Sequence, residues 1–329
     1  MITDPKNSPI VPATISAAPN YALYFDSIYH GYGDKTVLEN VDFRVSQGSF
    51  VCVVGPSGCG KSTLLRLITG QEQPREARRF EILGKPGGFP DARRGVVFQE
   101  YSLQPHRTLL GNVILGLELQ AKPWQLFSLS WRKKARAMAI QYLKWMRLED
   151  ALDRYPGELS GGMRQRAAIA QTLVTLEPNS NPQILCMDEA FSALDAGTRQ
   201  DLQVLALELW EKYHITVVFV THNLEEAVYL GTRVVVLSQY WTSDLGDGRP
   251  QGSRIVMDKR LDPRAMRTSW KQSPEFAKIV AEIREMIMNP NHRVHVDQFN
   301  QYSDHPDFFQ TLTEAESRKN GVIKRPEES

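Results

Sequence analysis

The chain has 329 residues, of which 42% are hydrophobic and 23% charged, an ordinary composition for one large globular domain with an extension. Its 39 basic and 38 acidic residues leave a formal charge of +1, so the balance favours neither nucleic acid nor an anionic membrane as the main partner. No run approaches the roughly 18 apolar residues of a spanning helix, and the first 20 residues lack the regions of a signal peptide, so we expect a cytosolic chain.

Residues 1–20 lack periodicity and indicate a flexible arm, after which residues 21–50 predict short strands of an antiparallel edge layer. This layer leads into a buried strand. Further strands are expected where apolar, β-branched runs occur, at 50–54, 95–98, 184–187, 216–220 and 233–237. Helical patterns such as 202–210 separate these runs, which is typical of a parallel sheet covered by helices.

Two further regions have helical patterns. Residues of about 101–178, including an amphipathic stretch at 133–146, predict a helical subdomain inserted into the α/β core of a domain that spans 21–245. The extension 246–329 contains one amphipathic helix at about 274–288, with Ser273 as its N-cap and Pro274 in the first turn. We expect this helix to pack back on the core, with a regulatory or dimer-contact role as the alternative.

A glycine-rich segment, Gly-Pro-Ser-Gly-Cys-Gly-Lys-Ser at 55–62, follows the strand 50–54 and opens a helix expected at 61–69. This is the context in which the G-x-x-x-x-G-K-[ST] pattern binds phosphate, because backbone N–H groups and the helix N-terminus converge on an anion. Lys61 would neutralise the β and γ phosphates, and Ser62 would offer its hydroxyl to Mg²⁺. A chance glycine-rich turn is the alternative, and the flanking strand and helix argue against it.

Two acids, Asp188 and Glu189, end the strand 184–187, and His222 ends the strand 216–220. The carboxyl ends of parallel strands lie at one sheet edge, so Asp188 is expected to face the metal and Glu189 to orient or deprotonate water. His222 would hydrogen-bond the γ-phosphate. Taken alone, such acids more often form a cap or a solvated turn and such a histidine is usually structural, but the phosphate loop favours chemistry.

The segment Leu-Ser-Gly-Gly-Met-Arg-Gln-Arg at 159–166 resembles the LSGGQ signature of ABC ATPases. Against that family, Gln99 is similar to the Q-loop glutamine, 192–195 to the D-loop, His222 to the switch histidine, and Tyr32 to the aromatic residue that stacks on adenine. The resemblance implies a P-loop NTPase (RecA-like) parallel sheet core with an antiparallel β edge layer and an inserted α-helical subdomain. It covers about 21–238.

The resemblance also implies ATP and Mg²⁺ as cofactors, with Glu189 and His222 as catalytic residues. The implied metal ligands are Ser62, Gln99 and Asp188. The implied nucleotide contacts are Tyr32, Gly55, Pro56, Ser57, Gly58, Cys59, Gly60, Lys61, Ser62, Thr63, Gln99, Ser160, Gly161, Gly162 and Asp195.

The signature implies that the chain acts in pairs. Ser160 and Gly162 would open a helix whose N-terminus attracts an anion, yet the phosphate in this chain is already held by Lys61. In the family, this helix faces the γ-phosphate of a second subunit. The expected partners are therefore a second copy or a paired ABC subunit, two transmembrane permease subunits at the cytoplasmic face of the cell membrane, and indirectly an external solute-binding protein.

The sequences of segments 160–166, 192–199 and 220–230 resemble those of the nitrate, sulfonate and taurine group of bacterial importers. This resemblance implies ATP-driven import of a small solute. Three features depart from the family: Ala190, the Pro-His-Arg-Thr segment at 105–108, and Gln171. None is an expected phosphate, metal or water ligand. The alternatives are an exporter, a soluble ABC protein that remodels DNA or ribosomes, and a weakly hydrolysing regulatory subunit; a single cassette without heptads and the pair Glu189 and His222 argue against the last two.

Two weaker features remain open. The segment 122–134 mixes aromatic and basic residues, and we expect a loop and helix start with a solvated basic face, with contact to permease loops or lipid headgroups as the alternative. The cysteines Cys52, Cys59 and Cys186 have no metal-ligand spacing, so we expect reduced thiols and no zinc. Cys59 in the phosphate loop is interpreted as a small tolerated side chain rather than a redox switch.

Overall fold

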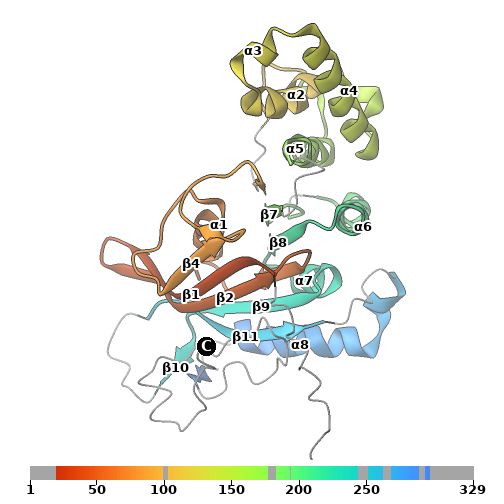
Figure 1. Cartoon of the computed structure of the whole chain (residues 1–329). Coiled ribbons are helices and arrows are strands. Elements are labelled where there is room, and N and C mark those ends of the chain that lie inside the picture. The colour runs from red at the N-terminus through yellow and green to blue at the C-terminus, as the bar shows by residue number, and fades with distance from the viewer. Residues whose placement is uncertain are drawn as a thin grey trace, which may run out of the picture.

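The largest element of the fold is a six-stranded sheet (Figure 1). A computed structural model describes residues 20–98, 103–176, 183–192, 194–243, 251–261, 268–288 and 293–296. The strands of this sheet, in spatial order, are β11 (Arg254–Arg260), β9 (Arg233–Ser238), β3 (Phe50–Val54), β8 (Thr216–Val220), β7 (Ile184–Asp188) and β6 (Arg94–Val97). All are parallel except β11, which pairs antiparallel with β9. The expected parallel core is confirmed.

A second, antiparallel sheet has the order β2-β1-β4-β5 and forms the edge layer that the sequence predicts. Its strands are β1 (Tyr21–Tyr32), β2 (Lys35–Ser46), β4 (Arg79–Ile82) and β5 (Lys85–Pro86). Helix α1 (Lys61–Thr69) shares one apolar core with this layer and with the main sheet, in which Phe25, Leu64 and Val53 are fully buried together. The helix that follows the phosphate loop is therefore enclosed by two sheets.

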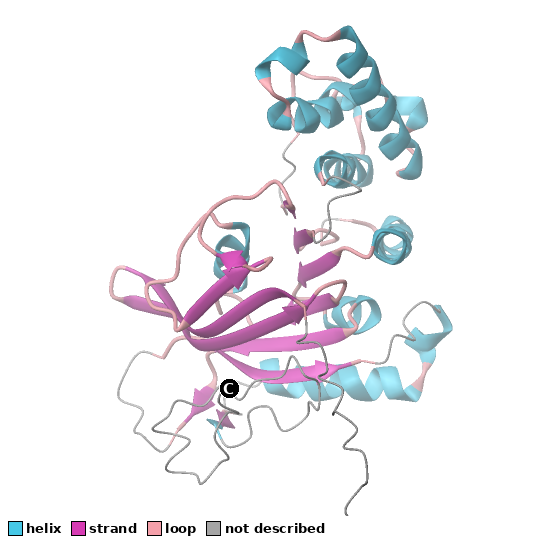
Figure 2. Ribbon diagram, viewed as in Figure 1, coloured by secondary structure: helices cyan, strands magenta, loops and turns pink. Residues whose placement is uncertain are grey.

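Four helices form an arm that projects from the strand-rich body (Figure 2). They are α2 (Leu109–Gln120), α3 (Pro123–Leu126), α4 (Leu129–Trp145) and α5 (Gly161–Thr175), with the short 3₁₀ helices η1 (Glu149–Ala151) and η2 (Pro156–Glu158) between the last two. Side chains of Thr108 and Ser128 cap α2 and α4. Thr172 Oγ1 in α5 donates to Val96 O in β6, at 3.0 Å, and so links the arm to the main sheet. The inserted helical subdomain is confirmed.

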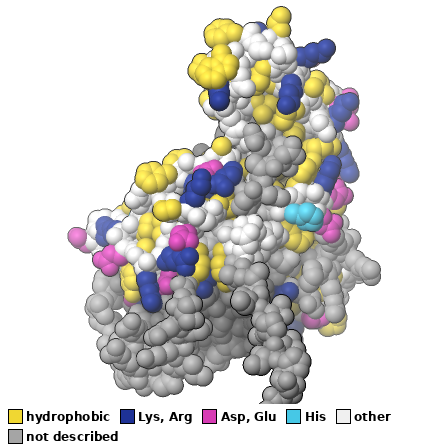
Figure 3. Space-filling view, viewed as in Figure 1, with side chains coloured by type: hydrophobic (Ala, Val, Ile, Leu, Met, Phe, Trp, Pro, Cys, Tyr) yellow, Lys and Arg dark blue, Asp and Glu magenta, His cyan; other side chains and the backbone are white. Residues whose placement is uncertain are grey.

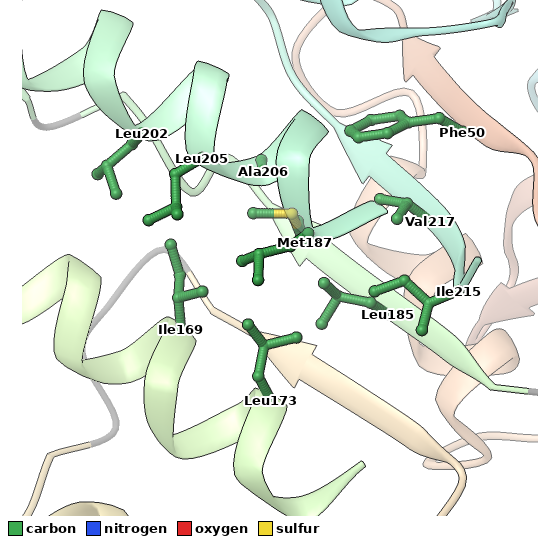
Figure 4. Close-up of a pocket in the computed structure, with 11 residues that line it drawn as sticks. Phe50, Ile169, Leu173, Leu185, Met187, Leu202, Leu205, Ala206, Ile215 and Val217 are labelled. Atoms are coloured by element: carbon green, nitrogen blue, oxygen red, sulfur yellow. The ribbon is translucent and has the colours of Figure 1, made fainter. Parts of the chain in front are cut away.

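The main sheet is covered on its other side by α5, α6 (Ala196–Tyr213), α7 (Leu224–Leu230) and α8 (Pro274–Met288). A small apolar cavity lies where α5 and α6 meet above β3, β7 and β8 (Figure 4). Its lining is Phe50, Ile169, Leu173, Leu185, Met187, Leu202, Leu205, Ala206, Leu209, Ile215 and Val217. Because no polar side chain lines it, we interpret it as a packing seam and not as a nucleotide site.

The sheet continues past residue 245, because β11 is its edge strand. The 3₁₀ helix η3 (Thr268–Gln272) precedes α8, which lies where the sequence predicts a helix. Phe276, Val280 and Ile283 of α8 are buried in the core that also contains α7, so this helix packs back on the body as expected. The short strands β10 (Trp241–Thr242) and β12 (Val294–His295) pair in parallel. Among the helices described, none has the length and apolar character needed to cross a bilayer.

The antiparallel edge of the main sheet is held by a buried ion pair between Arg233 and Asp258. Arg233 Nε donates to Asp258 Oδ1 at 2.7 Å, and both side chains are at most 6% exposed. The same guanidinium donates to Arg44 O of the antiparallel layer at 2.5 Å. One arginine thus connects β9, β11 and β2.

We predict that Asp258→Ala lowers the free energy of unfolding by about 3–5 kcal/mol, because it leaves a buried guanidinium without its counter-charge. The matched control is Glu81→Ala, which breaks a pair with Arg79 that is about one-third exposed on both sides and should cost at most about 1 kcal/mol. Urea denaturation followed by tryptophan fluorescence measures both. Equal losses in the two variants would contradict the prediction.

Candidate functional site

The phosphate loop connects β3 to α1 and depends on two glycines. Gly60 is the N-cap of α1 with φ 94°, and a Cβ there would lie 2.8 Å from a Val37 methyl group. A Cβ on Gly55 would lie 2.0 Å from Leu237 O of β9. Both positions therefore require glycine, one for its positive φ and the other for the close approach of two backbones.

Lys61, the first residue of α1, has its ammonium group held against the loop. Its Nζ donates to Gly55 O at 2.9 Å and to Pro56 O at 3.0 Å, and the residue is 8% exposed. Cys59 beside it is fully buried, and burial raises the pKa of this thiol against the opposing effect of Lys61. Both properties fit the interpretation of Cys59 as a small tolerated side chain.

Ser62 and Asp188 meet although they are far apart in the chain. The Ser62 hydroxyl donates to the Asp188 carboxylate at the end of β7. Burial raises the pKa of Asp188, and the hydrogen bond from Ser62 opposes this shift. Two oxygen groups of the kind that Mg²⁺ prefers thus lie side by side at the open end of the phosphate loop.

Glu189 and His222 also contact each other across the ends of β7 and β8. Glu189 Oε1 lies 3.1 Å from His222 Nδ1, and Glu189 N–H donates to Val220 O at 2.9 Å. Glu189 has φ 46°, a left-handed conformation that is rare for a residue with a side chain. Such strain persists where the surroundings enforce it and is common at reactive sites.

Tyr32, expected to stack on adenine, lies at the end of β1 and is 44% exposed. Its hydroxyl donates to Glu72 Oε2 at 2.6 Å and accepts from Arg66 Nη1 at 3.2 Å. His30 packs edge-on against the ring with the centroids 5.3 Å apart, and its Nε2 lies 3.1 Å from Glu72 Oε2. Because Arg66 belongs to α1, the aromatic ring is tied to the helix of the phosphate loop. Sequence reasoning missed Glu72 and Arg66, which carry no motif of their own.

The signature segment lies at the start of α5, at the base of the arm, whereas α1 lies within the body (Figure 1). Ser160 is the exposed N-cap of α5, and its hydroxyl accepts from Met163 N–H at 3.3 Å. Asp195 caps α6 in the same way by accepting from Thr198 N–H at 3.0 Å. A Cβ on Gly162 would lie 2.5 Å from Thr198 Cγ2, so the starts of these two helices pack closely.

Two of the expected loop residues are not described. Gln99, the expected Q-loop glutamine, lies outside the described residues, as does Ala193 of the D-loop. Of the departures from the family, Ala190 is buried, and Gln171 Nε2 donates to Asn112 O of α2 at 3.1 Å. The departure at Gln171 therefore takes part in packing within the arm.

The segment 122–134 forms the tip of the arm, where apolar and basic side chains gather on the surface (Figure 3). The exposed fractions of Trp124, Phe127 and Leu129 are 68%, 86% and 82%. Lys133 and Lys134 are exposed, as expected of a solvated basic face. Seven Lys or Arg residues and no acidic residue lie between Glu118 and Glu149. The exposed apolar groups were not expected.

Comparison with known proteins assigns the family. A family model described as ABC transporter matches residues 38–192. The taurine import ATP-binding protein of Rhizobium johnstonii is 40% identical over 256 residues, which are 76% of this chain and 88% of the relative. The nitrate import ATP-binding protein of Synechococcus elongatus is 33% identical over 282 residues, 84% of this chain and 96% of the relative.

Solved structures of ABC cassettes are also similar to this chain. A dimeric bacterial ABC transporter cassette matches with a TM-score of 0.59 and 30% identity, over 73% of this chain and 99% of the other. A dimeric post-hydrolysis state of an ATP-binding cassette bound to ADP and Pi matches with the same TM-score and 28% identity, with the same coverage.

Proposed function

We propose that this chain, which belongs to the ATP-binding proteins of ABC transporters and is an ATPase, powers the import of a small solute across a cytoplasmic membrane. The observation that carries the enzymatic part is the convergence of Lys61, Ser62 and Asp188 with the contact between Glu189 and His222. The transport part rests on relatives whose names specify taurine, nitrate and bicarbonate transport. We retain 21–245 as the nucleotide-binding domain and 246–329 as an extension that contributes to its edge.

The phosphate loop would hold the triphosphate through charge. A phosphate group offers Lys61 Nζ charged acceptors, which bind more strongly than the neutral carbonyls of Gly55 and Pro56. The fit of Mg²⁺ is supported by the adjacent Ser62 hydroxyl and Asp188 carboxylate, with Gln99 as a further proposed ligand. When bound, Mg²⁺ would neutralise charge on the β and γ phosphates.

Glu189 would orient the attacking water and accept its proton, and His222 would donate a hydrogen bond to the γ-phosphate. The contact of His222 Nδ1 with Glu189 Oε1 supports this division of roles, because it fixes the orientation of the imidazole ring. It also argues against the regulatory alternative, in which both groups would be dispensable.

We predict that Glu189→Gln keeps ATP binding and lowers the turnover number for ATP at least about 100-fold, because an amide cannot accept the proton from water. Phosphate release measures turnover, and a fluorescent ATP analogue measures binding. The matched control is Glu211→Gln on the exposed side of α6, which should retain activity. Undiminished turnover in the Glu189 variant would refute the assignment of the base.

We further propose that two copies sandwich ATP, with Ser160 of one chain facing the phosphate loop of the other. Support comes from the exposure of Ser160 on a part of the molecule separate from α1, and from the dimeric state of similar cassettes. The backbone N–H groups at the start of α5 would then bind a phosphate that is held by the phosphate loop of the other chain.

This arrangement predicts complementation between two inactive variants. Lys61→Ala loses the phosphate cradle, and Ser160→Arg blocks the signature; each alone should be inactive. A mixed pair contains one site built from the intact loop of one chain and the intact signature of the other, so mixing should restore part of the ATPase activity. Mixtures that stay inactive although native mass spectrometry shows mixed pairs would contradict the sandwich.

The partners we propose are two transmembrane permease subunits, fed by an external solute-binding protein. The apolar tip of the arm supports a protein contact, because exposed apolar groups of this size gather at interaction sites. Its excess of basic residues fits an amphipathic, acidic segment of such a permease. A location at the cytoplasmic face of the membrane follows from this contact.

We predict that the tagged chain co-purifies with integral membrane proteins from cells of its own organism, and that Lys61→Ala in those cells abolishes uptake of taurine, nitrate or bicarbonate. Trp124→Ser with Phe127→Ser should weaken co-purification while the isolated protein keeps its ATPase activity. If the tagged chain is recovered without any membrane protein, and Lys61→Ala leaves the uptake of all three solutes unchanged, the results would favour a soluble ABC ATPase.

A further inference from the structure

A buried carboxylate, Glu226, connects the loop of the switch histidine to α6. Glu226 in α7 is 4% exposed and has hydrogen-bond donors on both oxygens. Thr221 Oγ1 donates to Glu226 Oε2 at 3.0 Å, and Gln203 Nε2 in α6 donates to Glu226 Oε1 at 3.4 Å. Asn223 N–H in turn donates to Thr221 Oγ1 at 3.0 Å. The carboxylate therefore holds Thr221 directly and Asn223 through Thr221, on the two sides of His222.

The same carboxylate reaches the D-loop through Arg199. Arg199 Nε lies 3.6 Å from Glu226 Oε1 and donates to Phe191 O at 3.3 Å, while its Nη2 donates to Leu194 O at 2.7 Å. Phe191 directly precedes the D-loop, and Leu194 lies within it, next to Asp195 at the start of α6. Two loops with proposed roles at the nucleotide thus share one buried anchor.

The C-terminal extension contacts this anchor through one lysine. Lys271 in η3 donates from Nζ to Gln203 Oε1 at 3.0 Å and lies 3.9 Å from the ring centroid of Tyr229 in α7. The amide of Gln203 therefore accepts from Lys271 on one side and donates to Glu226 on the other. The segment that carries Lys271 is secured by α8, whose Glu282 Oε2 accepts from Lys259 Nζ of β11 at 2.6 Å.

We propose that the segment 268–288 positions the hydrolytic site: Lys271 orients Gln203, Gln203 orients Glu226, and Glu226 holds the loops of His222 and of Asp195. Lys271, Gln203 and Glu226 are positioning residues, since none contacts the phosphate loop. The inference rests on the proposed role of His222. It gives a role to the C-terminal extension, which carries none of the nucleotide motifs. Positioning of this kind affects the rate because a displacement of about 1 Å at a reacting group can cost up to about 100-fold in rate.

The test compares Lys271→Met with Lys212→Met in the full-length protein. Both lysines lie over aromatic rings, Lys212 over Trp145 at 4.3 Å, but only Lys271 donates to Gln203. We expect Lys271→Met to lower the turnover number about tenfold with an unchanged KM for ATP, and Lys271→Arg to restore most of it. Lys212→Met should keep the turnover number of the wild type.

A double-mutant cycle with Gln203→Leu separates positioning from general destabilisation. If Lys271 acts through Gln203, adding Lys271→Met to Gln203→Leu lowers the turnover number no further. Full additivity, or a wild-type turnover number in Lys271→Met, would overturn the proposal. Absence of ATP hydrolysis in the wild-type protein would instead refute the proposed function, so the two failures are distinguishable.

Discussion

Enclosure of helix α1 between two sheets is the constraint on which the rest of the site depends. The side chains of Leu64, Leu67 and Ile68 are fully buried in the apolar core that α1 shares with both sheets. Lys61, the first residue of α1, is consequently presented from an element that is anchored in this core. A phosphate cradle made of backbone N–H groups needs such anchoring, because those groups cannot be repositioned individually.

The remaining parts of the site are connected to α1 by hydrogen bonds or lie on strands next to β3. Tyr32 is tied to the helix through Arg66, and Asp188 through the hydrogen bond from Ser62. Strand β8 carries the loop of His222 and lies between β3 and β7, so the three strand ends that hold the chemistry are immediate neighbours. The arm, in contrast, joins the body through contacts such as the one between Thr172 and Val96, and its helix α5, which Ser160 caps, lies apart from α1 (Figure 1). This separation suits a site completed by a second chain.

Buried charge has two different uses in the body. The pair of Arg233 and Asp258 joins β9 and β11 at the sheet edge and connects them to β2. Glu226 is equally buried, but it accepts a hydrogen bond from Thr221, which adjoins His222, and pairs with Arg199, which donates to the backbone of Phe191 and Leu194. Glu226 lies in α7 and is linked through Gln203 to Lys271 of η3, which connects the extension to the loop of His222.

The sequence by itself determined the order of strands and helices along the chain and named the proposed reacting groups, since both rest on local properties. The bounds of β3, β8 and α1 follow from apolar runs and from the glycines of the loop, and Lys61, Asp188 and His222 are named by the strand or helix that they adjoin. Only the tertiary structure decided what those groups contact. Glu72 beside Tyr32, β11 at the sheet edge, and Lys271 beside Gln203 come from positions that carry no pattern, because hydrogen bonds between distant segments depend on how whole layers pack. The exposed apolar tip of the arm is a further case, since the pattern of 122–134 does not distinguish apolar groups that pack inward from those that remain on the surface.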